Sequence, residues 1–295
     1  MRGSFANKTN PEKLNSFLFF FLSCKQKVSC MDIKNKRIVV TGAASGIGKE
    51  LVMLLSQYDC HVLAVDRNFD GLSQFLEQVP NSKAKISSYI CDIGYQEQID
   101  DLFEHARQEL GAIDIFIANA GYAYYEQIVN ADWDRIDQIF KVNAHSPIYT
   151  AIKMKLLHPD SAYTVVVTAS AIGKLGLPGY ALYGATKSAT DRFAEAYRFE
   201  LDDPSSLTLV YPIATRTQFF QEASRHEAPT PWPSQTPQQV ARAIIRGIEK
   251  DRKSIYPSLV YQIFLAIGRI IPPLYHLEQW IELQRFKKWI KDKAE

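Results

Sequence analysis

The feature that most restricts the fold is a regular alternation of short apolar runs with segments of helical periodicity. Six runs rich in β-branched or aromatic residues mostly lack polar alternation, which is typical of strands covered on both faces. They lie at 37–41, 61–66, 86–91, 113–119, 163–170 and 207–212. Between them, apolar residues recur at helical spacing, as in Ile47, Leu51, Leu54 and Leu55 or in Ile99, Leu102, Phe103 and Ala106. With right-handed crossovers, this alternation predicts an α/β protein whose doubly wound parallel sheet lies between two helical layers.

Composition adds few constraints on partners. The 295 residues are 46% hydrophobic and 22% charged, which is enough to bury the core of one α/β domain. A division into two small domains is the alternative. A net charge of +2 and the lack of a recognisable motif predict no nucleic-acid partner. The four cysteines show no metal-ligand spacing, so we expect neither a metal site nor a disulfide framework. Reduced thiols predict a cytoplasmic location.

Three regions are expected along the chain. The apolar run at 17–22 is six residues long, far short of the ~20 that span a bilayer. From Met31 onward, the sequence MDIKNKRIVVTG contains all of the first predicted strand and a short segment that leads into it. We therefore predict that Met31 is the biological start or that residues 1–30 are a disordered appendage. Residues 31–257 are expected to form a Rossmann-type catalytic domain, and residues 258–295 a C-terminal helical extension.

A glycine-rich segment follows the first predicted strand and opens the first predicted helix. The sequence is TGAASGIG at 41–48. Three glycines allow a tight turn, close approach of the backbone to a pyrophosphate and close packing of helix on sheet. An ordinary strand-to-helix turn is the alternative, but the position between strand and amphipathic helix favours a dinucleotide site. The residues predicted to hold the cofactor here are Gly42, Ser45, Gly46, Ile47 and Gly48.

Acidic residues follow the second and third predicted strands. Asp66 lies eighteen residues beyond Gly48, near where an acid that holds the adenosine ribose hydroxyls is expected. Its carboxylate would repel a 2′-phosphate, so NAD is the predicted cofactor. Arg67 could pair with such a phosphate, which keeps NADP as the alternative. Asp92 could accept from the adenine amino group. The structural alternatives are an Asp-Arg-Asn turn at Asp66 and a helix-capping role for Asp92.

Two tyrosines and two lysines lie close together in SAIGKLGLPGYALYGATKSA, residues 170–189. Carbonyl reduction needs a group that passes a proton to the substrate oxygen. Tyrosine can do so if its pKa falls from ~10 toward ~7, roughly 4 kcal/mol of phenolate stabilisation. Tyr183 and Lys187 are four residues apart in a predicted helix, so their side chains share one face and can converge on one site. Tyr180 has only Gly184 at that spacing.

Three further polar residues in this stretch receive different predictions. Ser170 ends the fifth strand at the carboxyl edge of the sheet, and its hydroxyl can hold a substrate oxygen near Tyr183. Lys174 lies in a glycine-rich loop, where we expect a solvated ammonium. Ser188 points about a hundred degrees away from Lys187 and is expected to be an ordinary helix residue. Taken alone, a serine at the end of a strand is typical of a turn residue, and a Tyr/Lys pair on a helix is typical of an exposed surface. Their combination favours an active site.

Taken together, these residues resemble the short-chain dehydrogenase/reductase family, in its short single-domain branch. The matching motifs are TGAASGIG, NAG at 119–121 and Ser170 with YGATK, within a span from residue 34 to about residue 257. The resemblance implies an NAD- or NADP-dependent enzyme acting on CH–OH groups, with Tyr183 as general acid/base and Ser170 orienting the substrate. Lys187 is implied to lower the pKa of Tyr183 and to bind the nicotinamide ribose. Further cofactor contacts are implied for Asn119, Ala120 and Gly121.

The resemblance extends to two other segments. Asn143 in KVNAHS matches the family's helix asparagine, which is implied to hold a water between the catalytic lysine and solvent. Pro212 and Thr217 in YPIATRT match the segment beside the nicotinamide. Two positions depart, because Ile213 stands where glycine is usual and Ser146 where a glycine commonly follows the asparagine. A homodimer or homotetramer is also implied.

The substrate is expected to contact segments 122–130, 171–182 and 213–236. Their pocket candidates are Tyr122, Tyr124, Leu177, Tyr180, Phe219, Phe220 and Trp232. So aromatic a rim predicts an apolar or ring-containing secondary alcohol or ketone, or an aldehyde or primary alcohol. Steroid, retinoid, fatty acyl and terpenoid substrates all fit. The alternative function is a dinucleotide-binding sensor or scaffold that has lost turnover.

The tail combines apolar and basic residues. Residues 259–275 are almost wholly apolar, but they are too short and too broken by glycine, arginine and proline to predict a spanning helix. The next segment places Trp280, Leu283, Phe286 and Ile290 at helical spacing and ends in lysines. The pattern suits a lid over the substrate pocket or a subunit interface, which we favour. It also suits a peripheral membrane contact through 259–295.

Overall fold

One seven-stranded parallel sheet organises the chain. The computed structural model describes residues 32–79, 82–202, 204–217, 219, 223 and 233–294, so the predictions for 1–30, Phe220 and Trp232 lie outside the described residues. The strand order is β3-β2-β1-β4-β5-β6-β7. The strands are β1 (Arg37–Thr41), β2 (His61–Asp66), β3 (Lys85–Ile90), β4 (Ile115–Ala118), β5 (Thr164–Thr168), β6 (Ser206–Val210) and β7 (Ser254–Ile255). The first six confirm the predicted strands to within two residues at each end, whereas the two-residue β7 was not predicted.

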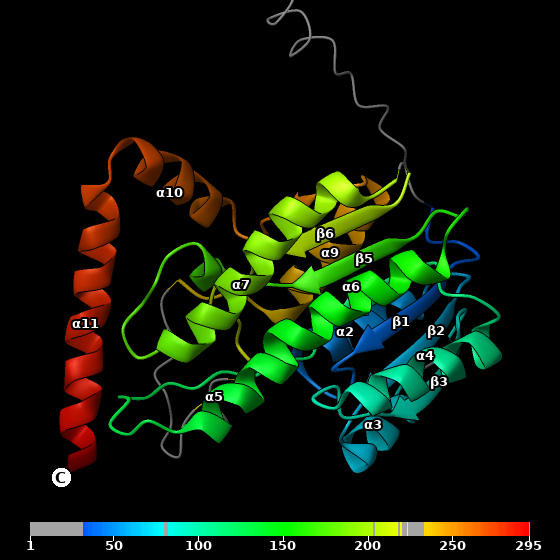
Figure 1. Ribbon diagram of the computed structural model, residues 1–295, viewed down its shortest axis with the longest axis horizontal. Helices are drawn as coiled ribbons and strands as arrows, with labels where there is room; N and C mark the ends of the chain where they lie inside the picture. The colour runs from blue at the N-terminus through cyan, green and yellow to red at the C-terminus, as the bar shows by residue number, and fades with distance from the viewer. Residues whose placement is uncertain are drawn as a thin grey trace, which may run out of the picture.

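Helices cover both faces of the sheet, which confirms the doubly wound Rossmann-type architecture (Figure 1). Buried residues of α2, α3 and α9 pack on one face, and those of α4, α6 and α7 pack on the other. The helices are α2 (Gly46–Leu55), α3 (Phe69–Leu76), α4 (Gln96–Leu110), α5 (Trp133–Phe140), α6 (Ser146–Leu157), α7 (Ala181–Tyr197), α9 (Pro237–Glu249), α10 (Leu259–Ile270) and α11 (Pro273–Ala294). A π-helical turn (Lys141–His145) joins α5 to α6, and short 3-10 turns lie at Ala171–Gly173 and Arg198–Glu200.

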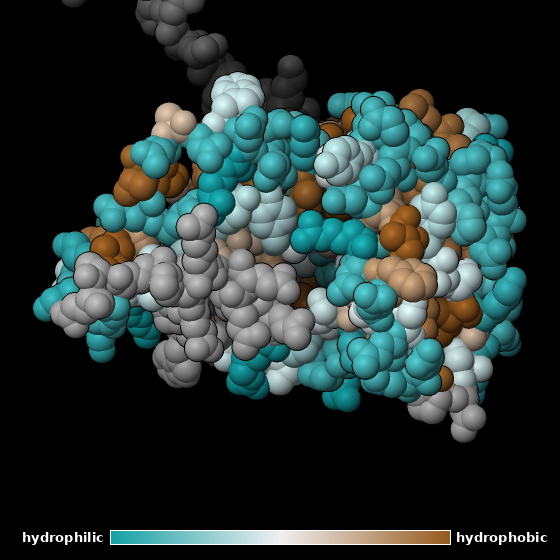
Figure 2. Space-filling view, turned by 90° about the horizontal axis from the view of Figure 1, so that it is seen from below, coloured by the Kyte–Doolittle hydropathy of each residue, from teal (hydrophilic) through white to brown (hydrophobic). Residues whose placement is uncertain are grey.

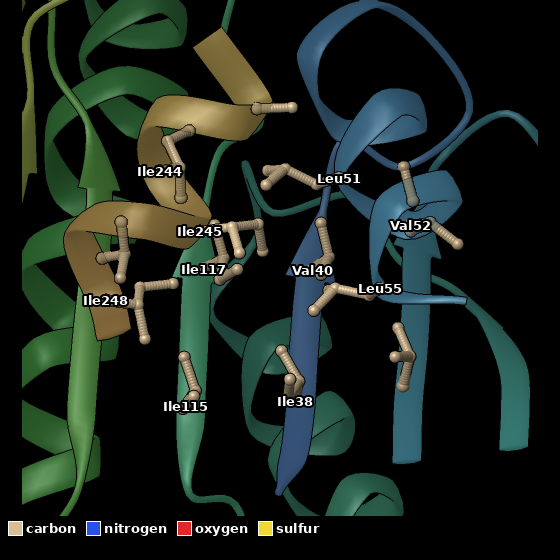
Figure 3. Close-up of a cluster of buried hydrophobic side chains, with 14 of the residues drawn as sticks. Ile38, Val40, Leu51, Val52, Leu55, Ile115, Ile117, Ile244, Ile245 and Ile248 are labelled. Atoms are coloured by element: carbon tan, nitrogen blue, oxygen red, sulfur yellow. The ribbon is translucent and has the colours of Figure 1, made fainter. Parts of the chain in front are cut away.

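The apolar stripes of α2 and α9 explain how one face is sealed. Figure 3 shows Leu51 and Leu55 of α2 beside Ile244 and Ile248 of α9, above Val40 of β1. All five side chains are at most 3% exposed. Helix α9 begins at a capping box, in which Thr236 and Gln239 bind each other's backbone N–H, so its start is fixed by sequence. Burial of these side chains holds both helices in place behind the glycine-rich turn at 41–48.

The direction of the strand order reverses at β1, which pairs with β2 on one side and β4 on the other. Crossovers leave β1 and β4 toward opposite sides, so a crevice opens at their carboxyl ends, where ligands bind in such sheets. A cleft of about 640 Å³ lies there, and its lining includes the residues that directly follow β1 to β5 and Pro212, two residues after the end of β6. Helices α10 and α11 form an arm beside this end of the sheet (Figure 1). Within the described residues, no helix is both long enough and apolar enough to span a membrane.

Candidate active site

The turn between β1 and α2 is built as a dinucleotide cradle. Gly42 and Gly46 have φ values of +71° and +54°, a region that side chains with a Cβ rarely adopt. A Cβ on Gly48 would lie 1.9 Å from the carbonyl oxygen of Gly42, so only glycine lets α2 pack against the turn. Ser45 and Ile47 line the cleft beside the first turn of α2, while Gly48 lies behind it. The N-terminal N–H groups of α2 therefore meet the cleft as an anion site, and these residues fit a bound dinucleotide.

Acidic side chains line the cleft at the ends of β2 and β3. The carboxylate of Asp66 accepts from the backbone N–H of Ala44 and of Asn68, both at 2.9 Å. Asp92 accepts from the N–H of Gly94 at 2.9 Å, and its carboxylate lies 4.0 Å from the guanidinium of Arg67. The turn contact given as the alternative for Asp66 is thus present, whereas Asp92 makes a turn contact with Gly94 and does not cap α4, whose N-cap is Tyr95. These contacts fix the carboxylates that line the cleft. Arg67 lies beside an acid on the mostly exposed rim.

Asn119 joins the ends of three strands. Its backbone N–H and that of Ala120 donate to the Thr41 hydroxyl at 3.1 and 3.2 Å. The side-chain amide donates to the Thr41 carbonyl at 3.1 Å and accepts from the Thr168 hydroxyl at 3.1 Å. Asn119, Ala120 and Gly121 all line the cleft, as do Pro212, Ile213 and Thr217. These bonds fix the floor of the cleft where β1, β4 and β5 end.

The side chains of Ser170, Tyr183 and Lys187 lie close together in the cleft. Ser170 caps the 3-10 turn after β5, where its Oγ accepts from the Ile172 N–H at 3.3 Å. Tyr183 and Lys187 lie on the buried side of α7 and are 9% and 4% exposed. The ammonium of Lys187 lies 5.7 Å from the centre of the Tyr183 ring and donates to the Thr168 carbonyl at 2.8 Å. The i, i+4 spacing thus brings both side chains to one cleft, as expected from helix geometry, and their catalytic roles stay a prediction.

The electrostatics of this trio correct one prediction. Burial raises the pKa of Tyr183 to about 12, and the hydrogen bond with Ser170 only partly opposes this rise. The pKa is thus raised in this structure and does not fall toward 7, because burial outweighs the hydrogen bond with Ser170. Burial also lowers the pKa of Lys187 to about 8. At neutral pH, Tyr183 is thus a phenol that holds its proton, and Lys187 is still an ammonium.

Asn143 anchors a loop beside Lys187. It lies in the π-helical turn, is 1% exposed, and donates from its amide to the Tyr122 carbonyl at 2.7 Å and to the Thr186 hydroxyl at 3.2 Å. Its oxygen accepts from the Tyr122 N–H at 3.1 Å. A Cβ on Gly121 would lie 3.0 Å from this oxygen and 3.5 Å from the Lys187 ammonium, so both groups border the same small space. The water-holding role implied for Asn143 stays a prediction.

The family model for "short chain dehydrogenase" matches residues 36–228 of the chain. The chain belongs to the short-chain dehydrogenase/reductase family. Two relatives of this short-chain dehydrogenase/reductase come from Mus musculus. One, 17-beta-hydroxysteroid dehydrogenase 13, is 26% identical over 84% of the chain and 81% of its own length. The other, epidermal retinol dehydrogenase 2, is 26% identical over 92% of the chain and 87% of its own length.

Solved structures share the fold of this short-chain dehydrogenase/reductase. A short-chain dehydrogenase from Sphingobium yanoikuyae in complex with NADPH has a TM-score of 0.70 and 21% identity, covering 81% of this chain and 94% of its own. A short chain dehydrogenase/reductase from Burkholderia phymatum in complex with NAD has a TM-score of 0.69 and 20% identity, covering 86% of this chain and 96% of its own. Identities this low show the fold alone.

Several of the predicted substrate-pocket residues line the cleft of this dehydrogenase/reductase. Among the predicted pocket residues, Tyr122, Leu177, Tyr180 and Phe219 line the cleft. Tyr124 does not, and its hydroxyl instead lies 3.3 Å from that of Tyr122. Tyr180 is 4% exposed, and its hydroxyl finds no hydrogen-bond partner in the described part of the chain. The predicted pocket residues that line the cleft are therefore aromatic or aliphatic, and the Tyr180 hydroxyl lacks a partner among the described residues.

The C-terminal helices of the dehydrogenase/reductase complete the cleft. The sequence predicted a lid or a subunit interface here but not which residues of the two helices line the cleft. Tyr261 of α10 and Glu278 and Glu282 of α11 line it. Phe286 and Trp289 of α11 pack against Tyr125, with ring centres 5.5 and 4.6 Å apart, and Tyr125 packs on Tyr180 at 4.7 Å. These four α11 residues are spaced by four, four and three, so they define one helix face. That spacing is the signal that could have found them.

The predicted apolar stripe of α11 is partly wrong. Leu283, Phe286 and Ile290 are half-buried, but Trp280 is 59% exposed. Apolar residues occur on both sides of this helix, so a single stripe could not be drawn from spacing alone. The inner face of α11 instead combines two carboxylates with two aromatic rings.

Lys174 and Ser188 are also corrected. The ammonium of Lys174 is not solvated but binds Asp191 of α7 at 2.7 Å and lies 4.9 Å from the centre of the Tyr211 ring. Ser188 donates to the Gly173 carbonyl at 3.0 Å. Both side chains tie α7 to the loop that follows Ser170. They thereby hold the segment that carries Ser170 and the helix that carries Tyr183 and Lys187 at a fixed separation.

Proposed function

We propose that this protein is an NAD(P)(H)-dependent oxidoreductase that interconverts an apolar or ring-containing alcohol and its ketone or aldehyde. The observation that carries the proposal is the convergence of Ser170, Tyr183 and Lys187 beside a glycine-lined dinucleotide cradle, within one cleft. The family supplies the reaction class, and the aromatic wall of the cleft supplies the preference for apolar substrates.

In the reducing direction, Tyr183 acts as the general acid. Its raised pKa keeps the phenol protonated at neutral pH, so it can donate to a substrate carbonyl oxygen as charge develops there. A bound nicotinamide would supply the hydride in reduction and accept it in oxidation. The phenolate left on Tyr183 gains the hydrogen bond from Ser170 and the field of the Lys187 ammonium. In the oxidising direction the same phenolate takes the proton from the alcohol.

Ser170 and Lys187 have distinct positioning roles. The Ile172 N–H occupies a lone pair of Ser170, which leaves the hydroxyl hydrogen of Ser170 free to donate to Tyr183 or to a substrate oxygen. Lys187 is held by the Thr168 carbonyl at the end of β5, so its position does not depend on Tyr183. We assign Lys187 a second contact with the ribose of the bound dinucleotide.

NAD is the proposed cofactor, with NADP as the alternative. Asp66 keeps its carboxylate fixed by two backbone N–H groups at the end of β2, where it would repel a 2′-phosphate. Arg67 lies near Asp92, which reduces its positive field toward such a phosphate. The two structural neighbours named above are complexes with NADPH and with NAD, so both forms remain in the test.

The proposed substrates are alcohols and ketones with bulky apolar groups. The printed names of two relatives refer to a hydroxysteroid and to retinol, which are apolar alcohols. Tyr122, Leu177, Tyr180 and Phe219 offer such molecules an aromatic wall. We also propose a homodimer or homotetramer, and a cytoplasmic location in keeping with the two described cysteines, Cys60 and Cys91, which are buried free thiols.

The direct experiment follows oxidation of NADH and of NADPH in the presence of a panel of steroid, retinoid, fatty acyl and terpenoid carbonyl compounds. We expect turnover with at least one apolar carbonyl and a higher kcat/KM with NADH. If the protein binds NADH tightly yet turns over none of the panel in either direction, the alternative of a dinucleotide-binding sensor replaces the enzyme.

A further inference from the structure

Among the described residues, the contacts of helices α10 and α11 with the catalytic domain come from one face of each helix. The Tyr261 hydroxyl of α10 donates to the Ala171 carbonyl at 2.7 Å, next to Ser170. On α11, Gln279 donates to the Gly176 carbonyl at 2.9 Å, and Phe286 and Trp289 pack against Tyr125. This inner face therefore covers the substrate end of the cleft.

The elbow between α10 and α11 is tightly packed. A Cβ on Gly268 would lie 2.0 Å from the ring of Tyr275, and the Tyr275 hydroxyl donates to the Leu265 carbonyl at 2.9 Å. Tyr275 thus fixes α11 against the last turns of α10. The two helices form one arm (Figure 1), and the sides of both helices that do not contact the domain make up its outer surface.

That outer surface, which we call the outer arm face, carries large apolar side chains in solvent. On α10, Val260, Ile263, Ile267 and Ile270 follow one another by three, four and three residues and so share one side of the helix. Their exposed fractions are 69%, 51%, 42% and 82%. The apolar part of the outer arm face consists of Leu259, Val260, Ile263, Ile267, Ile270, Ile271, Leu277, Trp280 and Ile281. Brown hydrophobic atoms are visible among the teal at the left-hand end of the molecule in Figure 2, where α11 lies.

Charge is sorted between the two faces of α11. The acids Glu278 and Glu282 are turned toward the cleft, and burial raises the pKa of Glu278. The exposed side chains of the second half of the helix are mostly cations: Arg285, Lys287, Lys288 and Lys291, with Asp292 as the exposed acid among the described residues. Arg285 pairs with Glu282, so the three lysines are the cations that this surface offers to a partner. Apolar anchors followed by lysines, with the acids turned away, form a pattern that complements a negatively charged lipid surface.

We propose that the outer arm face docks on the surface of an anionic lipid bilayer, with the apolar side chains at the headgroup boundary and the lysines against anionic headgroups. The lid and the membrane contact, which the sequence left as alternatives, thus belong to opposite faces of the same two helices. The proposal does not depend on the reaction assigned above. A second copy of the chain is a poorer occupant, because a two-fold interface sets a patch against itself, and among the described residues of the arm one exposed acid, Asp292, would have to match three exposed lysines.

The test is flotation of the full-length protein with vesicles of phosphatidylcholine alone or mixed with phosphatidylserine. We expect flotation with the mixed vesicles and little with phosphatidylcholine. The triple variant Lys287→Gln, Lys288→Gln, Lys291→Gln should weaken binding about a hundredfold at low salt, because each lysine near an anionic surface contributes about fivefold. Its charge-matched control is Lys34→Gln, Lys83→Gln, Lys250→Gln, which removes three exposed lysines elsewhere and should bind like the parent.

The apolar contribution is tested separately. The variant Val260→Ser, Ile263→Ser, Ile270→Ser should lose flotation even at low salt, while Leu156→Ser and Phe199→Ser, at exposed apolar residues elsewhere, should not. NADH titration and circular dichroism on each variant report whether the fold is intact. The proposal is overturned if the parent stays unbound with mixed vesicles, or if the control triple weakens binding as much as the arm triple. It is also overturned if sedimentation shows a dimer that the apolar variant dissociates while vesicles bind neither protein.

Discussion

The ion pair between Asp191 and Lys174 should stabilise the fold far more than a surface pair. Asp191 is 3% exposed and accepts from the Lys174 ammonium and, at 2.6 Å, from the Tyr211 hydroxyl. Replacing it by asparagine keeps the volume but leaves the cation, whose side chain is 20% exposed, without its counter-charge. Removing one partner of a buried pair costs about 3–5 kcal/mol, and because Lys174 keeps some solvent we expect about 3 kcal/mol for Asp191→Asn.

Denaturant unfolding followed by circular dichroism measures this loss. The matched control is Asp100→Asn, because the carboxylate of Asp100 pairs with Lys153 but is 38% exposed, and exposed pairs contribute about 0–1 kcal/mol. In a double-mutant cycle, Asp191→Asn with Lys174→Met should be less destabilised than the sum of the single variants, since no unpaired charge is left. If Asp191→Asn unfolds with the same free energy as Asp100→Asn, or if the cycle is additive, Asp191 does not hold α7 to its loop.

Three further predictions concern the cleft. Burial lowers the pKa of Lys187 from 10.5 to about 8, so the ammonium is lost as the pH rises through 8. The kcat/KM for carbonyl reduction should therefore fall over that range. A flat pH profile up to pH 10.5 would contradict the role of Lys187. Tyr180→Phe removes a buried hydroxyl without a described partner, so its free energy of unfolding should equal the parent's or exceed it by up to about 1 kcal/mol; a clear loss would mean that the hydroxyl is bonded. Asp66→Asn removes the charge that would repel a 2′-phosphate, so the ratio of kcat/KM for NADPH to that for NADH should rise at least about tenfold, whereas an unchanged ratio would place the selectivity elsewhere.

Local sequence patterns were sufficient wherever the deciding contacts are close along the chain. The apolar runs predicted six strands because both faces of a parallel sheet are buried, but β7 pairs through only two residues and leaves no such run. Tyr183 and Lys187 could be paired because four residues on a helix bring side chains to one face. The glycine turn could be assigned from its place between strand and helix.

Long-range contacts could not be predicted in the same way. Lys174 contacts Asp191, seventeen residues further along, because α7 packs beside the loop that carries Lys174. The composition of that loop alone therefore wrongly predicted a solvated side chain. The pKa of Tyr183 depends on how deeply α7 is buried, which no local pattern reports. Likewise, α11 has apolar residues on two faces, and only its position over the cleft shows which face is inside.

The measurement that tests the central claim most directly is turnover and NADH binding by Tyr183→Phe. The phenol is the proposed proton donor, and loss of a general acid lowers rates by about 10²–10⁴-fold. Tyr183→Phe should therefore bind NADH with nearly the parent's affinity and lose at least about a hundredfold in turnover, while Tyr180→Phe, the matched loss of a hydroxyl in the same cleft, should keep most of its activity. Turnover by Tyr183→Phe close to the parent's would contradict the assignment of the active site.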